Sequence, residues 1–285
     1  MTADLPGFPP AEVCAMLGKA SSSGNGKGVI MKVLVIGGSG LIGSQVVARL
    51  TELGHEAVPA SPSTGVNAVT GEGVADAVAG VHTVVDVSNS PSWADDDVLN
   101  FFTTSSRNLL DAERAAGVQH HVALSIVGAD RAAESGYMRA KVAQEKVIVE
   151  SGQPYSIVRA TQFFEFVDGI ADSFAQGDTV RAPHGAFQPI AAADVALAVT
   201  RAATSDPVNA VINIAGPEKH GMDDFIRTRF AATGDARTVV TDNDARYYGA
   251  VLDDRSIVPT DDEEVAVYPT TFSDWMAAQA ASGAQ

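Results

Sequence analysis

Three side chains near the middle of the chain have the types and the spacing for proton transfer. Tyr137 and Lys141 stand four positions apart in a stretch with helical periodicity, so both lie on one face of the predicted helix. A phenol titrates near pH ~10 and a neighbouring ammonium favours the phenolate, so Lys141 is predicted to bring the pKa of Tyr137 toward working pH. Ser125 ends the preceding predicted strand and can converge with the phenol on one carbonyl oxygen. This pattern predicts general acid and base chemistry at a carbonyl.

The tyrosine and lysine pair is a weak signal by itself, because this spacing occurs by chance on many helix surfaces. Its interpretation depends on whether a ligand site lies nearby. An apolar, β-branched run at 32–36 predicts a buried strand, and apolar residues within 41–50 then recur at a helical period. Gly37, Gly40 and Gly43 therefore stand in a strand-to-helix turn.

At each of these three positions there is a physical reason for glycine. Gly37 permits the tight bend, Gly40 lets the backbone approach a pyrophosphate, and Gly43 lets the helix pack close to the strand. The helix start offers free N–H groups and the positive end of the helix dipole, which favour phosphate. The order of strand, turn and helix predicts a dinucleotide site rather than a merely structural turn. The predicted contacts are Gly37, Gly38, Ser39, Gly40, Leu41, Ile42 and Gly43.

The elements that must position these residues alternate between strand and helix. The predicted strands are 32–36, 56–60, 66–69, 83–87, 120–127 and 154–159, and the predicted helices are 41–50, 73–79, 95–116 and 137–150. This alternation predicts an α/β fold with a Rossmann-type, doubly wound parallel sheet. Later segments are less regular, with helices at 163–176, 193–203 and 222–232 and strands at 187–190 and 208–214.

The chain is predicted to form a single domain over 31–285, in which 160–285 mainly forms a small C-terminal substrate lobe over the carboxyl ends of the strands. Residues 1–30 are rich in proline, glycine and serine, which is typical of a flexible extension. The extension is therefore left out of the fold.

The formal net charge of -16 disfavours nucleic acid and anionic lipid as partners, although acidity also serves solubility alone. Cys14 is the only cysteine, which excludes an intramolecular disulfide and fits a reducing compartment. The sequence has no apolar run as long as a membrane span. We therefore predict a cytoplasmic protein with a small-molecule substrate. The sequence does not distinguish a monomer from a homodimer.

Together, the glycine segment 37–43, Ser125 and Tyr137-x-x-x-Lys141 resemble the short-chain dehydrogenases/reductases. The GxxGxxG spacing and the modest length are similar to the atypical or extended, NmrA-like subgroup of NAD(P)H-binding proteins. Supporting segments are 107–117, 157–164 and 188–196. The resemblance covers nearly everything from Met31 to about Trp275.

The resemblance implies roles for individual residues. Tyr137 would exchange a proton with the reacting oxygen, Lys141 would assist it and hold the ribose, and Ser125 would orient the substrate carbonyl. Asn108 would match the asparagine that holds a water in the proton relay. The segment expected beside the adenosine ribose and the pyrophosphate includes Val87, Ser88 and Asn89.

The choice of nucleotide depends on the residues after the second strand. An NAD site usually carries an acid about 20 residues beyond the turn, which accepts a hydrogen bond from the ribose 2′-OH. Here Ser61, Ser63 and Thr64 occupy that place, with no acid to repel a 2′-phosphate and no arginine to bind one. Their hydroxyls can donate to phosphate, so NADP(H) is favoured over NAD(H). The alternative is that they are ordinary turn residues.

Candidate substrate contacts are Gln162, Phe163 and Trp93, although aromatic residues at such spacing are more often core. No metal site is predicted, because His120 and His121 point to opposite faces of a strand and the remaining histidines lack ligand spacing.

The favoured function is an NAD(P)H-dependent oxidoreductase that transfers hydride to a small carbonyl, enone or quinone-like substrate, with Tyr137 as the general acid or base. One alternative is a non-catalytic NAD(P)H-binding redox sensor of the NmrA-like type, since many members of that subgroup lack the tyrosine. A further alternative is a sugar-nucleotide epimerase or dehydratase. The spacing from Ser125 to Tyr137 is closer to that of the short-form enzymes than to that of the extended, sugar-modifying ones.

Overall fold

The centre of the molecule is a seven-stranded sheet in which every pair of neighbouring strands is parallel. The computed structural model describes residues 30–283, so the predicted extension, apart from Ile30, and Cys14 lie outside the described residues. The strands are β1 (Lys32–Ile36), β2 (Glu56–Ala60), β3 (Thr83–Asp86), β4 (His120–Ile126), β5 (Tyr155–Ala160), β9 (Ala210–Ala215) and β14 (Val265–Val267). Their spatial order is β14-β9-β5-β4-β3-β1-β2.

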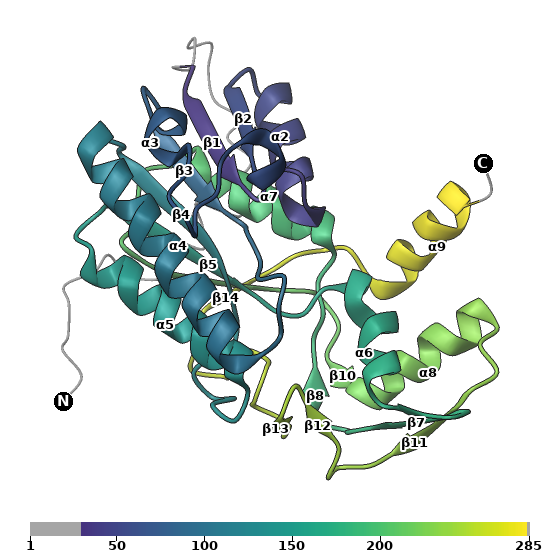
Figure 1. Ribbon diagram of the computed structural model, residues 1–285. Helices are drawn as coiled ribbons and strands as arrows, with labels where there is room; N and C mark the ends of the chain where they lie inside the picture. The colour runs from purple at the N-terminus through teal and green to yellow at the C-terminus, as the bar shows by residue number, and fades with distance from the viewer. Residues whose placement is uncertain (1–29, 284–285) are drawn as a thin grey trace.

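Helices cover both faces of this sheet, because its strands are apolar on both sides (Figure 1). On β1, Val33 and Val35 pack into a first buried cluster with α2 (Leu41–Glu52) and α7 (Ala192–Ala203). Leu34 and Ile36 face the other way. That other face carries α3 (Val74–Ala77), α4 (Asp95–Ala116) and α5 (Gly136–Glu150). The predicted α/β fold with a doubly wound parallel sheet is confirmed.

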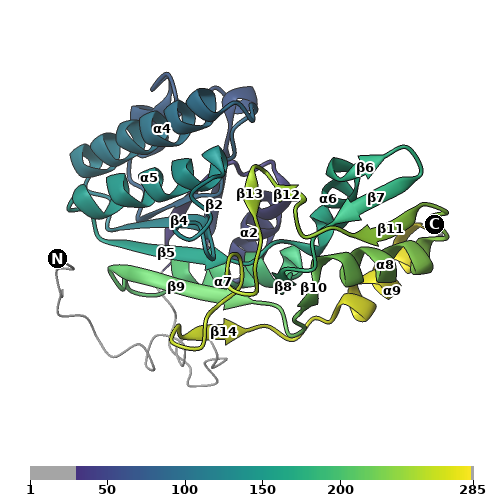
Figure 2. The ribbon, with the colours of Figure 1, turned by 90° about the horizontal axis from the view of Figure 1, so that it is seen from below.

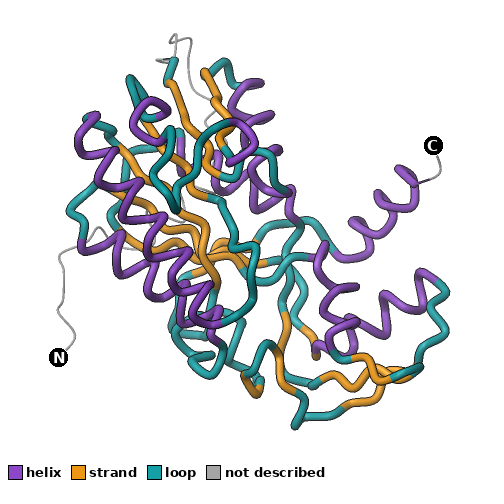
Figure 3. Tube along the Cα trace, viewed as in Figure 1, coloured by secondary structure: helices purple, strands orange, loops and turns teal. Residues whose placement is uncertain are grey.

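The smaller part of the molecule has a hydrophobic cluster of its own, formed mainly by residues after 160 (Figure 2). Its helices are α6 (Val167–Ser173), α8 (Met222–Thr233) and α9 (Phe272–Gly283). Its strands are β6 (Ala175–Gln176), β7 (Thr179–Ala182), β8 (Ala186–Phe187), β10 (His220–Gly221), β11 (Thr238–Thr241), β12 (Arg246–Tyr247) and β13 (Ala250–Val251). These strands are short and lie apart from the main sheet (Figure 3).

The predicted strand at 66–69 is wrong. The side chain of Asn67 accepts a hydrogen bond from the N–H of Val69 at 3.0 Å, which bends the backbone into a turn. The amide of Asn108 on α4 donates to the carbonyls of Ala68 and Val69 at 2.8 and 3.0 Å. These contacts use backbone groups that a strand would need for pairing, and β2 is the edge strand of the sheet.

Several other boundaries differ from the predictions. The predicted helix at 163–176 begins instead as a 3-10 turn, Phe164–Phe166, and ends with α6 at Ser173. The predicted strand at 187–190 is reduced to the end of β8. The elements that were not predicted are β6, β7, β10, β11, β12, β13, β14 and α9. Within residues 30–283, none of the helices has the length and apolar character needed to span a bilayer.

Candidate functional site

A cleft of about 1110 Å³ lies at the carboxyl ends of the central strands. It lies where the strand order reverses, since β2 pairs with one side of β1 and β3 with the other. Ligands of open parallel sheets bind at such a point. Residues at the carboxyl ends of β1, β3, β4 and β5, or just after them, line it on one side, and the smaller part of the molecule supplies an outer wall.

The glycine turn between β1 and α2 forms one end of this cleft. A Cβ atom on Gly43 would lie 2.1 Å from the carbonyl oxygen of Gly37, and one on Gly38 would lie 2.7 Å from Pro59. Gly37 itself has a φ of +79°, which other residues rarely adopt. These glycines are therefore required by the fold itself.

Gly40 is different, because fewer protein atoms lie beside it than beside Gly38 or Gly43. Within 4 Å, a Cβ atom there would meet only the Gly37 oxygen among the described residues, at 3.3 Å. Gly40 is the N-cap of α2 at a φ of −80°, without a side-chain cap and without an acid in the first turn. A helix start that is open to a cleft and free of negative charge fits a pyrophosphate.

The next stretch of the cleft follows β3 and β2. Val87, Ser88 and Asn89 line it, and the hydroxyl of Ser88 donates to the buried carboxylate of Asp86 at 2.6 Å. Ser61 lines the cleft after β2 and exchanges a hydrogen bond with the exposed Ser63, with 2.8 Å between their hydroxyl oxygens.

Tyr137 lies in the same cleft, on the first turn of α5. Its hydroxyl donates to Oδ1 of Asn89 at 2.8 Å. Its ring lies 5.3 Å from the Trp93 ring and 5.8 Å from the Phe102 ring, measured between centroids. Burial raises the pKa of the phenol above its ordinary value, and Tyr248 raises it further, whereas the hydrogen bond to Asn89 opposes this shift.

Lys141 also reaches the cleft but is almost fully buried, with 4% of its surface exposed. Its ammonium donates to the Leu124 carbonyl at 2.9 Å and to Oε1 of Gln144, and it lies 4.2 Å from the centroid of the Phe102 ring. Burial lowers its pKa to about 8, although Asp86 and Glu145 oppose the shift.

The predicted effect of Lys141 on Tyr137 is wrong in this structure. The phenol has a raised pKa rather than a lowered one, because burial is the largest cause of the shift and the opposing hydrogen bond to Asn89 is smaller. The ammonium is directed toward backbone and amide oxygens. The phenol is therefore protonated at neutral pH.

The hydroxyl of Ser125 does not point toward Tyr137, although both residues line the cleft. It donates to Oε1 of the buried Glu145 at 2.5 Å. Arg159 holds the same carboxylate through two hydrogen bonds of 2.8 and 2.6 Å. Since the hydroxyl hydrogen is already donated, the predicted orientation of a substrate carbonyl by Ser125 requires this bond to break.

The structure does not bring Asn108 into the cleft. Its amide nitrogen bonds the carbonyls of Ala68 and Val69, so it holds the turn after β2 in place. The predicted proton-relay role of Asn108 therefore has no geometry to support it, because α4 directs the side chain to this turn.

The end of β5 presents polar atoms without partners. Gln162 is 8% exposed and lines the cleft, yet neither atom of its amide has a hydrogen-bond partner among the described residues. The hydroxyl of the neighbouring Thr161 is also buried and unpaired within the described chain. Buried polar groups are normally satisfied, so these atoms mark a place for a polar ligand group.

Aromatic rings form the outer wall. Phe163 and Phe166 stack with their centroids 5.2 Å apart, and Trp93 stacks on Tyr248 at 5.4 Å. All four residues line the cleft. Tyr248 was not predicted, because sequence alone does not show that the β12–β13 hairpin reaches the carboxyl ends of the strands. Glu145 and Gln144 were also missed, although they stand four and three positions after Lys141 and so share its helix face.

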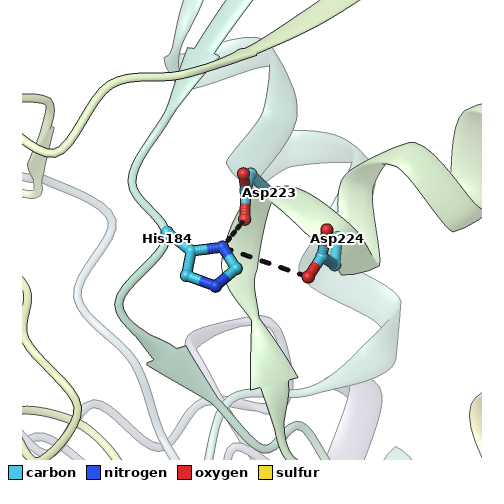
Figure 4. A group of neighbouring side chains, drawn as sticks. All are labelled: His184, Asp223 and Asp224. Carbon is cyan, nitrogen blue, oxygen red and sulfur yellow. Dashed lines mark hydrogen bonds and ion pairs between the residues drawn. The ribbon is translucent and has the colours of Figure 1, made fainter.

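A separate cluster lies away from the cleft, where His184, Asp223 and Asp224 come together (Figure 4). Nδ1 of His184 lies 2.7 Å from Asp223 and 4.0 Å from Asp224. Their separation in sequence, 39 residues between His184 and Asp223, explains why ligand spacing did not predict the group. Arg227 lies 2.8 Å from both carboxylates, so a guanidinium already compensates their charge.

The titration of this cluster reflects those contacts. Hydrogen bonding to Asp223 raises the pKa of His184 above its ordinary value. Burial alone would raise the pKa of Asp223, but hydrogen bonds from Thr241, His184 and Arg227 lower it. The arrangement has the character of an ion-pair network between α8 and the neighbouring strands.

A family model described as NAD(P)H-binding matches residues 37–206. A (4-alkanoyl-5-oxo-2,5-dihydrofuran-3-yl)methyl phosphate reductase from Streptomyces griseus is 28% identical over 203 residues, which cover 65% of this chain and 68% of the relative. The photosystem II assembly factor Ycf39 from Cyanophora paradoxa is 24% identical over 153 residues, about half of each chain at 49% and 48%.

Among solved structures, a short-chain dehydrogenase/reductase superfamily protein from Agrobacterium tumefaciens, with bound NAD, superposes with a TM-score of 0.66. It is 19% identical, and the superposition covers 89% of this chain and 97% of the other. This likeness shows a shared fold. The prediction of an NAD(P)H-binding family is confirmed by the family model, whereas the finer assignments to the short-chain dehydrogenases/reductases and to the NmrA-like subgroup stay predictions.

Proposed function

The chain belongs to the NAD(P)H-binding family, and we propose that it is an NAD(P)H-dependent oxidoreductase of the short-chain dehydrogenase/reductase type. Its substrate in this proposal is a small carbonyl, enone or quinone-like compound. The glycine turn, the loop after β3 and Lys141 would hold the nucleotide. When bound, the nicotinamide supplies a hydride.

The observation that carries the proposal is the place of the Tyr137 phenol. It lies in the cleft that contains the glycine turn, and it is protonated at neutral pH, since burial raises its pKa further above the ordinary value. A protonated phenol can give its hydrogen to an oxygen that gains negative charge during reduction. Asn89 fixes the direction of the hydroxyl before a substrate arrives. The unpaired amide of Gln162 offers a second contact for a polar group in the same space.

We propose NADP(H) as the preferred nucleotide. The residues after β2 are hydroxylic, and no carboxylate in Ser61–Thr64 would repel a 2′-phosphate. Affinities for both reduced nucleotides, measured by titration, test this preference. Tighter binding of NADH than of NADPH would reject it.

Replacement of Tyr137 by Phe tests the enzyme proposal. We expect turnover with a carbonyl or quinone acceptor to fall by about 10²-fold or more, because the proton donor is lost. The affinity for NADPH should stay within about twofold, since the aromatic ring is retained and only the hydroxyl is lost. Unchanged turnover in this variant would reject the mechanism.

A non-catalytic redox sensor is the second candidate. The observation in its favour is that the Ser125 hydroxyl and the Lys141 ammonium are both engaged by protein groups. One relative is named as an assembly factor rather than as an enzyme. NADPH binding without consumption of NADPH in the presence of any tested acceptor would favour this candidate.

A further inference from the structure

The outer wall of the cleft contains a continuous row of three aromatic rings: Tyr137, Trp93 and Tyr248. Trp93 lies 5.3 Å from Tyr137 and 5.4 Å from Tyr248 between ring centroids, and the planes of Trp93 and Tyr248 differ by 15°. The row therefore begins at the proposed proton donor and continues outward. Trp93 and Tyr248 are 59% and 43% exposed, so large apolar ring surfaces remain uncovered in the cleft.

The backbone conformation at Tyr248 is strained. Tyr248 and Gly249 connect β12 to β13 and have φ values of +46° and +95°. Glycine, asparagine and aspartate favour such a two-residue hairpin turn, whereas a bulky side chain is strained there. Strain at a ligand-facing residue is a sign of function. The hairpin places the Tyr248 ring against Trp93.

The polar groups of the cleft are mostly neutral. Among the described lining residues, Lys141 is the only one with a basic side chain, and its ammonium already has oxygen partners. Asp97 and Glu165 add negative charge. The unpaired amide of Gln162 offers a donor and an acceptor without charge. Beyond the nucleotide-binding end, no described residue that lines the cleft offers a free cation to a phosphate or diphosphate on the substrate.

We propose that the acceptor is an uncharged planar ring compound with a ring carbonyl, of the quinone or cyclic enone class. The ring of the acceptor stacks on Trp93 and Tyr248. The amide of Gln162 forms a hydrogen bond with a polar group of the bound acceptor or nucleotide. Offset stacking with rings of this kind stabilises a flat ligand more than a sugar. The proposal rests on the proposed function and excludes phosphate esters and sugar nucleotides as substrates.

A binding experiment tests this class of ligand without relying on turnover. The Trp275→Phe protein keeps Trp93 as its single tryptophan, so its fluorescence reports on the row of aromatic rings. The probes are 2-(hydroxymethyl)anthraquinone and anthraquinone-2-sulfonate, which share a ring system and differ in charge, together with UDP-glucose. We expect the uncharged quinone to quench Trp93 and to bind at least tenfold more tightly than the sulfonate, and UDP-glucose to bind more weakly still.

Tyr248→Leu in this background should weaken binding of the uncharged quinone by about tenfold, whereas Tyr155→Phe, at a tyrosine outside the cleft, should leave it unchanged. Equal or tighter binding of the sulfonate or UDP-glucose, or no effect of Tyr248→Leu in a protein that is folded by circular dichroism, overturns the proposal. NADPH consumption is then measured with tetramethyl-1,4-benzoquinone. Quinone binding without NADPH consumption would reject the oxidoreductase proposal but support the proposed binding of a flat ligand on the aromatic row. Failure of one proposal is thereby distinguished from failure of the other.

Discussion

The hydroxyl of Tyr137, on α5, donates to Oδ1 of Asn89, which follows β3, over 2.8 Å. The same oxygen accepts the backbone N–H of Ser90 at 2.9 Å. The phenol is therefore oriented by a neutral acceptor whose own position is fixed by the backbone. Burial raises the pKa of the phenol, and this acceptor moderates the rise. The pair links the nucleotide side of the cleft to the proposed proton donor.

Replacement of Asn89 by Ala should release the phenol. We expect kcat to fall by about tenfold, because a positioned proton donor contributes ~10² or more and part of that depends on orientation. Steady-state kinetics measure this change. Asn100→Ala is a matched control, since Asn100 lines the cleft but bonds to Thr104. An effect confined to the affinity for the nucleotide would show that Asn89 is a cofactor contact and not a positioning residue.

Two alanine substitutions separate the structural glycines from the ligand-facing one. Gly43→Ala should destabilise the fold by about 3 kcal/mol or more, because its Cβ would overlap the Gly37 oxygen. Gly40→Ala should change the free energy of unfolding by about 1 kcal/mol or less, since its Cβ would make one tight contact, 3.3 Å from the Gly37 oxygen, and alanine is a poorer N-cap than glycine. It should nevertheless weaken NADPH binding by about tenfold, because the methyl group would meet the pyrophosphate. Urea denaturation and nucleotide titration check both values, and unchanged nucleotide affinity in Gly40→Ala would contradict the assignment.

The lowered pKa of Lys141 predicts that the free energy of unfolding rises with pH. Its pKa is lowered from 10.5 to about 8 by burial, so between these values the unfolded chain binds more protons than the folded one. Below pH ~8 both states are protonated and the cost of burying the charge is fully present. The free energy of unfolding of the wild type, relative to Lys141→Met, should therefore rise by about 3 kcal/mol between pH ~8 and ~10.5. A difference that is flat with pH would contradict the lowered pKa.

The buried pair of Glu145 and Arg159 predicts strong coupling. Arg159→Met leaves a buried carboxylate with the Ser125 hydroxyl as its remaining hydrogen-bond donor, so we expect a loss of about 3–5 kcal/mol in the free energy of unfolding. The double variant with Glu145→Gln should lose less than the sum of the single changes. Lys146→Met on the same helix is the control, because its pair with Glu150 is exposed and should contribute less than about 1 kcal/mol. Additive single effects in urea denaturation would show that the pair is not coupled.

Much of the fold follows from local patterns in the sequence. The run before Gly37 has the length and branching of a buried strand, and β1 has the predicted bounds. Helix α4 also matches its prediction, since its first turn is acidic and Gly117 ends it at a φ of +73°. The cleft gathers the glycine turn, Tyr137 and Lys141 because parallel strands bring their carboxyl ends to one edge.

The remaining details depend on contacts between distant residues. The direction of the Ser125 hydroxyl is set by Glu145, twenty positions away, and that carboxylate is fixed by Arg159 on β5. The segment 66–69 forms a turn instead of a strand because the amide of Asn108, about forty positions later, donates hydrogen bonds to two of its carbonyl groups. The short strands of the smaller part of the molecule have too few residues to show an alternating pattern.

The two hydrophobic clusters that meet at the cleft affect how the protein should denature. Ile42 lines the cleft from the first cluster, whereas Ile170 and Tyr247 line it from the other. A ligand that contacts both sides binds fully only when both clusters are assembled, so its binding free energy adds to the cooperativity between them. Without a ligand, the two clusters should unfold over a broader range of temperature. In the complex of the protein with nucleotide and acceptor, they should unfold in a single, sharper transition.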